Sequence, residues 1–482
     1  MKKLIRKTAC FLLAFQLFST TAYAKPDWPK DTGIQAESGI VMDMDSGAIL
    51  YGQNIHLPYA PASITKILTA LVVLENCQLD ETVTYSETAV NSVESDSGNK
   101  LGSVAGDKLT VEDCLYGLLL ESSNQTANAL AEHTAGSIED FVALMNEKIK
   151  ELGCEESHFE NPSGLNGENQ YVSAYDMALI AQAAYSNEKL LEISSTASRK
   201  LAGTTNYPGG YTVNNEHRML KSGDEFYYEP AKAGKPGYLA AAGNTLVTYA
   251  EKDGRRLVSV ILKGQPRQYW SDARELLDFG FRSFRNGILA DMESRYVTGD
   301  EVLNLERGAF KCSDLMIDPA AQITLPLGAS LEDADLTVGA LPENHPERAV
   351  AQMTYTYNDR VVGTAFLLAK DGVAISDMTE TAPEATTPLP GENSAADQTE
   401  SGSSDQTPEK DPAASPLATA AVIAAILAIG LLAAAIAWVS WKRKKEAEEL
   451  ARRRERRRQR LQQSGEEEEF ERLLAEWKNK KH

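Results

Sequence analysis

Ser63 and Lys66 stand three residues apart in the stretch Pro61–Lys66, which opens a run of apolar residues at helical spacing. Residues three apart lie on one face of a helix. A serine hydroxyl becomes a nucleophile when a neighbouring base takes its proton, and a lysine can be that base if burial or nearby cations lower its pKa. The pattern predicts an activated serine at a helix start, where the positive end of the helix dipole would stabilise an oxyanion.

The serine–lysine spacing alone is a weak signal. From average residue usage it should occur about twice by chance in a chain of this length. The alternative is that Ser63 only caps a helix and that Lys66 is a solvated residue of its first turn. The rest of the chain has to decide between these two interpretations.

Composition sets limits on the function. The chain has 482 residues and a formal net charge of −21, which allows more than one domain and argues against a broad nucleic-acid-binding surface. Its 5 cysteines include no C-x-x-C pair and no cysteine–histidine ligand spacing, so neither a metal site nor a cofactor is predicted, and His133 and His158 are interpreted as structural. The spacing leaves open whether Cys77 pairs with Cys114 or Cys154.

Residues 1–24 are typical of a secretory signal peptide. A basic start precedes the apolar segment Ala9–Phe18, and Ala22–Ala24 has the small-x-small pattern of a cleavage site. The apolar run is too short for an uncleaved membrane anchor. We therefore expect the rest of the chain to be exported.

Three segments of different composition follow residue 375. Residues 376–415 are rich in Pro, Ser, Thr and acidic residues and predict a disordered linker. Residues 416–441 are almost wholly apolar and are followed by basic residues, which predicts one transmembrane helix in the cell membrane with a cytoplasmic C-terminus. Residues 442–482 are a charged cytoplasmic tail, interpreted as a solvated helix or as a docking site for an unidentified partner or anionic lipid.

The elements between these ends predict two domains. Residues 25–285 mix strand and helix patterns, typical of an α+β domain with helices packed on an antiparallel sheet. Hairpin turns are expected at residues 45–47 and 253–254, and helices at residues 63–74, 109–120, 124–134, 137–152 and 271–284. Residues 286–375 predict a small all-β domain, with alternating runs at residues 322–325, 337–338, 350–355 and 361–366.

Two more stretches offer polar side chains that could complete a site around Ser63. Ser122 and Asn124 follow an apolar helical run and supply a hydroxyl and an amide with one residue between them. Lys235 lies on an expected edge strand between Gly234 and Gly237, where glycines permit close approach of the backbone.

Together the three stretches resemble the motifs of the penicillin-recognising serine hydrolases. More narrowly, the chain is similar to low-molecular-mass penicillin-binding proteins, which are serine-type D-alanyl-D-alanine carboxypeptidases with a β-lactamase-like transpeptidase domain. The resemblance covers residues 30–285 and also includes the segments 61–70, 119–124, 127–132, 161–165, 174–178 and 215–220. The order of catalytic domain, β domain and membrane anchor is similar as well.

The resemblance implies a substrate and a mechanism. The substrate would be a peptidoglycan stem peptide ending in D-Ala-D-Ala. Ser63 would attack its last peptide bond to form an acyl-enzyme, with Lys66 as general base and Ser122 as proton relay. β-Lactams would react with Ser63 as covalent inhibitors.

The resemblance also implies four substrate-binding residues. Asn124 would hold the substrate amide, and Lys235 would bind the terminal carboxylate. Gly237 and Tyr238 belong to the same strand, and the backbone N–H of Tyr238 would form the oxyanion hole together with that of Ser63.

The third motif departs from the family pattern. Where the family has a threonine after the lysine, this chain has Pro236, and a second threonine of the pattern is replaced by Leu239. Losing a hydrogen bond to a charged group costs about 1.5–3 kcal/mol. The rival placement Lys232–Gly234 lies three residues too far from the following strand for the family pattern.

Two classes of function follow from these departures. One is an active, weakened carboxypeptidase. The other is a non-catalytic homologue that binds peptidoglycan or acts as a scaffold. The intact Ser63, Lys66 and Lys235 favour the first. A β-lactamase is a weaker third interpretation, because no deacylating glutamate is apparent.

Overall fold

A computed structural model describes residues 25–375, apart from residues 31–32, 94–97, 166 and 343. The predicted signal peptide, linker, transmembrane helix and tail all lie outside the described residues. Within the described part of the chain, no helix combines the length and the apolar character needed to cross a membrane.

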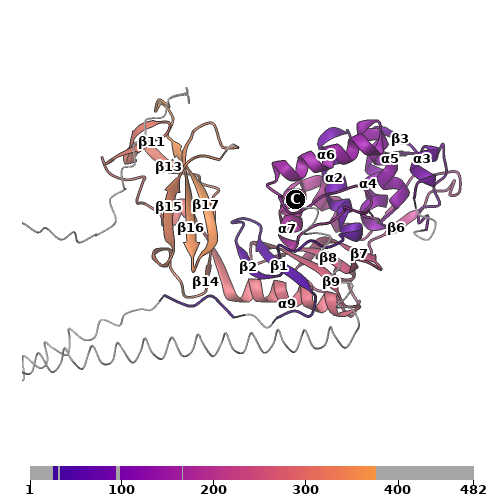
Figure 1. The fold of residues 1–482 in the computed structure, drawn as a ribbon, viewed down its shortest axis with the longest axis horizontal. Helices are drawn as coiled ribbons and strands as arrows, with labels where there is room; N and C mark the ends of the chain where they lie inside the picture. The colour runs from indigo at the N-terminus through magenta and orange to yellow at the C-terminus, as the bar shows by residue number, and fades with distance from the viewer. Residues whose placement is uncertain (1–24, 31–32, 94–97, 166, 343, 376–482) are drawn as a thin grey trace, which may run out of the picture. The chain divides into compact units, whose positions relative to one another are not determined.

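The first sheet has five antiparallel strands in the order β2-β1-β9-β8-β7 (Figure 1). Its members are β1 (Ser38–Asp43), β2 (Ile49–Gln53), β7 (Ala231–Leu239), β8 (Gly243–Lys252) and β9 (Arg255–Gly264). The two hairpins connect β1 to β2 and β8 to β9, as predicted from their turn residues. The strand that carries Lys235, β7, lies at one edge of the sheet.

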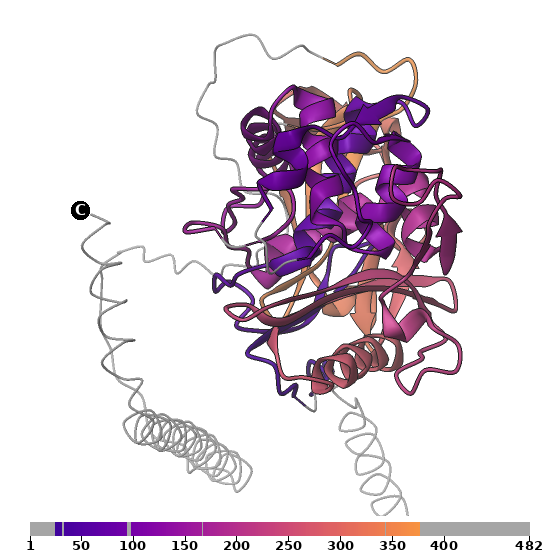
Figure 2. The same ribbon diagram turned by 90° about the vertical axis from the view of Figure 1, so that its right-hand side faces the viewer.

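The central strand β9 is buried on both faces. Val258, Val260 and Leu262 belong to one hydrophobic cluster, whereas Leu257 and Ile261, on the opposite face, belong to another. Helix α9 (Gln268–Ser283) covers the second face, and the helices between β2 and β7 cover the first (Figures 1 and 2). Strands covered on both sides read as continuous apolar runs, which explains the pattern of β8 and β9.

The helices of the first face are mostly those expected from periodicity. They are α2 (Thr65–Asn76), α3 (Glu87–Asn91), α4 (Val111–Leu120), α5 (Asn124–Ala135), α6 (Ile138–Glu151), α7 (Ala174–Ser186) and α8 (Glu188–Ser195). Thr110 caps α4 by accepting a hydrogen bond from the Asp113 N–H at 3.1 Å, as predicted. Helices α3, α7 and α8 were not predicted from the sequence. Two short antiparallel pairs complete this region: β3 (Thr82–Thr84) with β4 (Lys108–Thr110), and β5 (Ser198–Lys200) with β6 (Thr212–Asn214). A short 3₁₀ turn, η3 (Arg218–Leu220), also lies here.

Residues 284–369 form a second, six-stranded sheet. Its strands are β10 (Phe284–Ile288), β13 (Leu315–Ile317), β14 (Gln322–Pro326), β15 (Asp335–Gly339), β16 (Ala349–Tyr357) and β17 (Arg360–Ala369). All four alternating runs noted in the sequence lie in β14 to β17. The sheet packs on its own hydrophobic cluster, which includes Ile323, Met353 and Leu367. A hairpin of β11 (Val302–Leu305) and β12 (Gly308–Lys311), the short helix α10 (Leu289–Met292) and two 3₁₀ turns, η4 (Cys312–Asp314) and η5 (Leu331–Asp333), also lie in this region.

The cysteines of the described region are free thiols. Cys77, Cys114, Cys154 and Cys312 are buried and none of them forms a disulfide with another described residue. The pairing that the sequence left open is therefore absent among these four.

Candidate active site

The three predicted motifs meet at one cleft. The cleft has a volume of about 650 Å³, and its walls include Ser63, Ser122, Asn124, Pro236 and Tyr238. These residues come from the turn that precedes α2, the junction of α4 and α5, and the edge strand β7. Segments far apart in the sequence thus form one concave surface.

Ser63 lies in a 3₁₀ turn, η1 (Ala62–Ile64), and α2 begins only at Thr65. Among the described residues its hydroxyl is hydrogen-bonded to the Lys66 amine and to no backbone N–H of the helix. The preceding residue, Ala62, has a φ of 51°, which is unfavourable for a residue with a side chain and is typical of functional sites. The prediction that the helix starts at Ser63 is therefore wrong in detail, and the alternative that Ser63 is only a cap is wrong altogether.

Lys66 is completely buried and makes three hydrogen bonds. Its amine contacts Ser63 Oγ at 3.0 Å, Asn124 Oδ1 at 2.8 Å and the Ser163 carbonyl oxygen at 2.5 Å. The alternative of a solvated first-turn lysine is thereby excluded.

These three partners differ in what they can exchange with the amine. The amide oxygen of Asn124 and the carbonyl oxygen of Ser163 can only accept hydrogen bonds, whereas a serine hydroxyl can also donate one. A neutral lysine amine has two N–H groups and one lone pair. With both N–H groups on the two oxygens, the lone pair faces the Ser63 hydroxyl, which is the geometry of a general base on a nucleophile.

The electrostatic surroundings favour the neutral amine. Burial lowers the pKa of Lys66 well below its usual value, and the cations Lys235 and Lys100 lower it further, whereas Glu216 raises it. Removing an ammonium group from water disfavours its charged form. Lys66 is thus prepared to accept a proton.

The carbonyl that contacts Lys66 is held by a tight loop. Asn161 Oδ1 accepts hydrogen bonds from the Ser163 N–H at 3.2 Å, the Ser163 hydroxyl at 3.0 Å and the Gly164 N–H at 2.8 Å. Gly164 has a φ of 81°, and a Cβ there would lie 1.9 Å from the Ala62 carbonyl oxygen. Sequence reasoning missed this contribution, because a backbone carbonyl leaves no side-chain signal.

Ser122 and Asn124 reach the cleft through a sharp turn between α4 and α5. Ser122 has a φ of 61°, which reverses the chain before Ser123 caps α5. Asn124 is the first residue of α5 and is buried against Lys66. The Ser122 hydroxyl lies at the cleft wall and has no hydrogen-bond partner among the described residues, so it is available to a ligand.

The strand β7 comes very close to the nucleophile. A Cβ at Gly237 would lie 2.8 Å from the Ser63 backbone nitrogen and 2.5 Å from Thr245 Oγ1. Real Cβ atoms do not approach other atoms so closely, so this position requires glycine. The glycine of the third motif therefore brings the strand backbone next to the Ser63 N–H.

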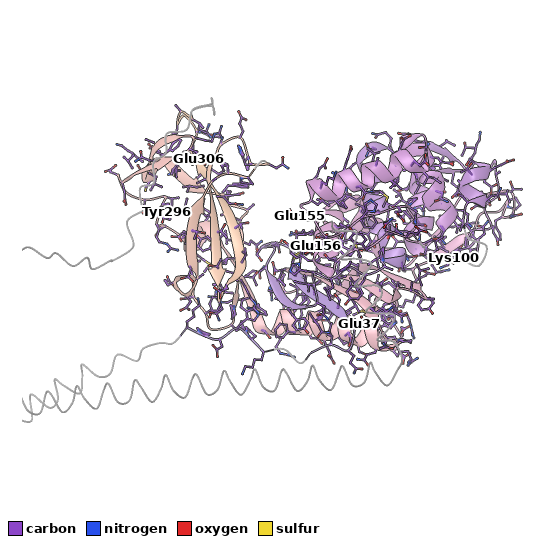
Figure 3. All side chains as sticks on the ribbon, in the orientation of Figure 1. Glu37, Lys100, Glu155, Glu156, Tyr296 and Glu306 are labelled. Atoms are coloured by element: carbon purple, nitrogen blue, oxygen red, sulfur yellow. The ribbon has the colours of Figure 1, made fainter. Side chains whose placement is uncertain are left out.

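Lys235 is buried beside a carboxylate that the sequence did not point to. Its amine lies 3.5 Å from Glu216 Oε2 and 3.2 Å from the Pro236 carbonyl oxygen. Glu216 also pairs with Lys100, which Figure 3 labels. Burial lowers the pKa of Lys235 to about 8, with Glu216 opposing the shift and Lys100 adding to it.

Pro236 fits the strand without distorting it. It stands opposite Leu246 in the β7–β8 register, and no bulge occurs at that position. An edge strand tolerates a residue that lacks an N–H group. Pro236, Gly237 and Tyr238 all line the cleft, whereas the Lys235 side chain is buried beside it.

A helix-covered antiparallel sheet with a buried lysine on a cleft serine is the architecture of a serine hydrolase. The family model described as D-alanyl-D-alanine carboxypeptidase matches residues 22–265. D-alanyl-D-alanine carboxypeptidase DacF of Bacillus subtilis is 31% identical over 292 residues, which cover 59% of this chain and 72% of that protein. D-alanyl-D-alanine carboxypeptidase DacB2 of Mycobacterium tuberculosis is 35% identical over 262 residues, covering 53% and 84%.

Solved structures include a D-alanyl-D-alanine carboxypeptidase from Mycobacterium tuberculosis, which is 33% identical with a TM-score of 0.47 and covers 55% of this chain and 95% of its own. The chain belongs to the D-alanyl-D-alanine carboxypeptidase family. The resemblance seen in the three motifs and the prediction of a hydrolase of this family are confirmed.

Proposed function

We propose that this protein removes the terminal D-alanine from peptidoglycan stem peptides through an acyl-enzyme on Ser63. One observation carries the proposal: Lys66 is buried with two partners that can only accept hydrogen bonds, which leaves the Ser63 hydroxyl as the donor to its lone pair. The names of the family and of its relatives supply the substrate class.

The acylation step would run as follows. Ser63 Oγ attacks the carbonyl carbon of the D-Ala-D-Ala bond while its proton passes to Lys66. The backbone N–H groups of Ser63 and Tyr238 stabilise the oxyanion. The proton then reaches the leaving amine through Ser122, the C–N bond breaks, and free D-alanine departs. Water hydrolyses the ester and restores the Ser63 hydroxyl.

Binding would use the remaining residues of the cleft. Asn124 would orient the substrate amide, and the Lys235 ammonium would pair with the terminal carboxylate. Pro236 supplies no hydroxyl for that carboxylate, so binding of the peptide would be weaker by about ten- to hundredfold than with a threonine. β-Lactams would acylate Ser63 in the same position.

Pro236 also favours a second candidate function, a non-catalytic homologue that binds peptidoglycan. In that case the cleft would bind the stem peptide without releasing D-alanine. The buried and fully partnered Lys66 favours catalysis, because a binding protein needs no base on the serine.

The cellular placement is part of the proposal. A cleaved leader at 1–24 and a transmembrane helix at 416–441 would fix the catalytic domain outside the cell membrane and the tail at 442–482 in the cytoplasm. The separate hydrophobic cluster of the second sheet supports a β domain between the catalytic domain and the anchor.

A labelled penicillin tests the acylation step. The full-length chain is expected to form a covalent adduct that is absent in Ser63→Ala. Lack of any adduct at high penicillin concentration would refute acylation at Ser63. Release of D-alanine from a pentapeptide substrate then separates the two functions: turnover supports the carboxypeptidase, and binding without release supports the non-catalytic homologue.

A further inference from the structure

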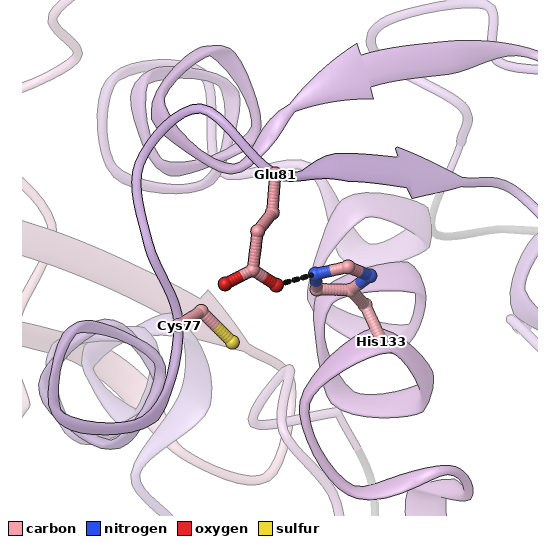
Figure 4. A group of neighbouring side chains, drawn as sticks. All are labelled: Cys77, Glu81 and His133. Carbon is pink, nitrogen blue, oxygen red and sulfur yellow. Dashed lines mark hydrogen bonds and ion pairs between the residues drawn. The ribbon is translucent and has the colours of Figure 1, made fainter.

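Three side chains with metal-binding atoms meet at the far ends of the two helices that carry Lys66 and Asn124. Cys77 follows α2, Glu81 lies in the next loop, and His133 is in the last turn of α5 (Figure 4). Their ligand atoms all lie within 4.8 Å of one another. We propose that Cys77, Glu81 and His133 bind a divalent transition-metal ion of the Zn²⁺ class.

The donor set matches that class of ion. Thiolate sulfur, imidazole nitrogen and carboxylate oxygen are the three protein ligands that zinc accepts, and a tetrahedral ion bound by three of them keeps one position for water. With bonds of about 2.0–2.3 Å, ligand atoms in such a site stand roughly 3.5 Å apart. The ligand atoms of Cys77, Glu81 and His133 would therefore need only small displacements to surround an ion.

The carboxylate and the imidazole are already oriented. The Gln78 N–H donates to Glu81 Oε1 at 2.7 Å, so that Oε2 lies 2.8 Å from His133 Nε2. Hydrogen bonds that fix a ligand from outside are characteristic of metal sites. An ion would replace the direct contact between Glu81 and His133 and bind both atoms.

Among the described residues, the Cys77 thiol has one hydrogen-bond partner, a hydroxyl. Cys77 Sγ lies 3.3 Å from Thr134 Oγ1, and that hydroxyl already donates to the Leu130 carbonyl oxygen at 2.7 Å. An ion that binds the sulfur would displace the thiol proton, because the thiolate is the form that ligates metals.

The local field favours a cation. Cys77 follows the C-terminus of α2, and His133 lies at that of α5, so the negative ends of two helices of twelve residues each point to this place. Glu81 adds a full negative charge. Sequence spacing did not reveal the group, because His133 is distant in the chain from the other two ligands.

Cobalt titration of the full-length, untagged chain tests the site. Co²⁺ bound to a thiolate gives a charge-transfer absorption in the near ultraviolet, and we expect one such ion per chain, displaced by Zn²⁺. Cys77→Ser should abolish the band. His133→Gln should weaken binding by more than about tenfold, since loss of even an outer hydrogen bond to a metal ligand costs about 10–100-fold.

Matched controls separate this site from other thiols and histidines. Cys154→Ser removes another buried thiol, and His56→Gln removes the histidine of the pair His56–Glu156, whose atoms lie 2.9 Å apart. Neither should change the band. Absence of a thiolate–cobalt band, or its survival in Cys77→Ser, would overturn the proposal. Zinc should also raise the unfolding temperature of the wild type and not that of Cys77→Ser, and an equal rise in both would contradict it.

Discussion

The helix side and the strand side of the cleft hold their buried lysines in different ways. On the helix side, Lys66 contacts three hydrogen-bond partners at 2.5–3.0 Å. On the strand side, Lys235 has two partners at the longer distances of 3.2 and 3.5 Å. An ammonium group has three donors, so Lys235 retains capacity that Lys66 does not.

This difference separates two tasks. The protein itself completes the surroundings of Lys66, which suits a group that exchanges a proton with a fixed neighbour. Lys235 has two partners for its three N–H groups among the described residues, which fits its proposed role in binding a substrate carboxylate. The sequence departs from the family pattern at Pro236, which lies on the strand side only. This departure should therefore affect substrate binding more than activation of Ser63.

Replacing Lys66 with Met has the largest expected effect. Without a base, acylation by penicillin and by peptide should both fall by about 10²–10⁴-fold, the usual contribution of general base catalysis. The matched variant Lys235→Met should lose less with penicillin. Stopped-flow measurements of the acylation rate compare the two variants, and thermal unfolding checks that both are folded. A greater loss of acylation in Lys235→Met than in Lys66→Met would reverse the assignment of the two sides.

The contact between the two sides gives the second prediction. In Gly237→Ala the new Cβ would lie 2.8 Å from the Ser63 nitrogen, so strand and nucleophile must move apart. Displacements near 1 Å at reacting groups cost about 10²-fold in rate, and we expect a loss of that order in acylation. Gly209→Ala is the matched control, since its Cβ meets no atom within 4 Å and it should act as wild type. A wild-type acylation rate in Gly237→Ala would show that the strand side and the helix side of the cleft need not be in contact.

Local signals in the sequence predicted much of this architecture. Thr110 as a cap and the turn at Asp253-Gly254 placed α4 and the β8–β9 hairpin nearly at their observed ends. Capping and turn chemistry act over a few residues, so they can be read directly from the chain. The 3₁₀ turn at Ser63 was missed, because its conformation is imposed by packing against distant segments.

The contacts that complete the site were less accessible to sequence reasoning. Motif similarity brought Ser63, Lys66 and Lys235 together, but it assigned no part to the Ser163 carbonyl or to Glu216. The first is a backbone group with no residue-type signature, and the second is one of many acidic residues in a chain with a strong negative charge. Only the fold distinguishes these groups from the rest.

Pro236→Thr tests whether the strand side of the cleft limits substrate binding and turnover. The new hydroxyl should strengthen binding of the terminal carboxylate and raise D-alanine release by about ten- to hundredfold. Pro236→Val controls for the loss of proline, since valine has the same branched shape as threonine but no hydroxyl. If D-alanine release rose as much in Pro236→Val as in Pro236→Thr, the effect would come from the backbone and not from the hydroxyl. No rise in either variant would show that Pro236 does not limit turnover.

The smallest expected effect is a shift of the pH profile of D-alanine release. Activity should rise with pH as Lys66 loses its proton and fall as pH passes the pKa of Lys235, about 8. Glu216 raises both pKa values, so Glu216→Gln should move both limbs to lower pH. Lys100 lowers both, so Lys100→Gln should move both limbs to higher pH. Shifts in the same direction for these two variants would contradict the electrostatic coupling, because the two replaced charges have opposite signs.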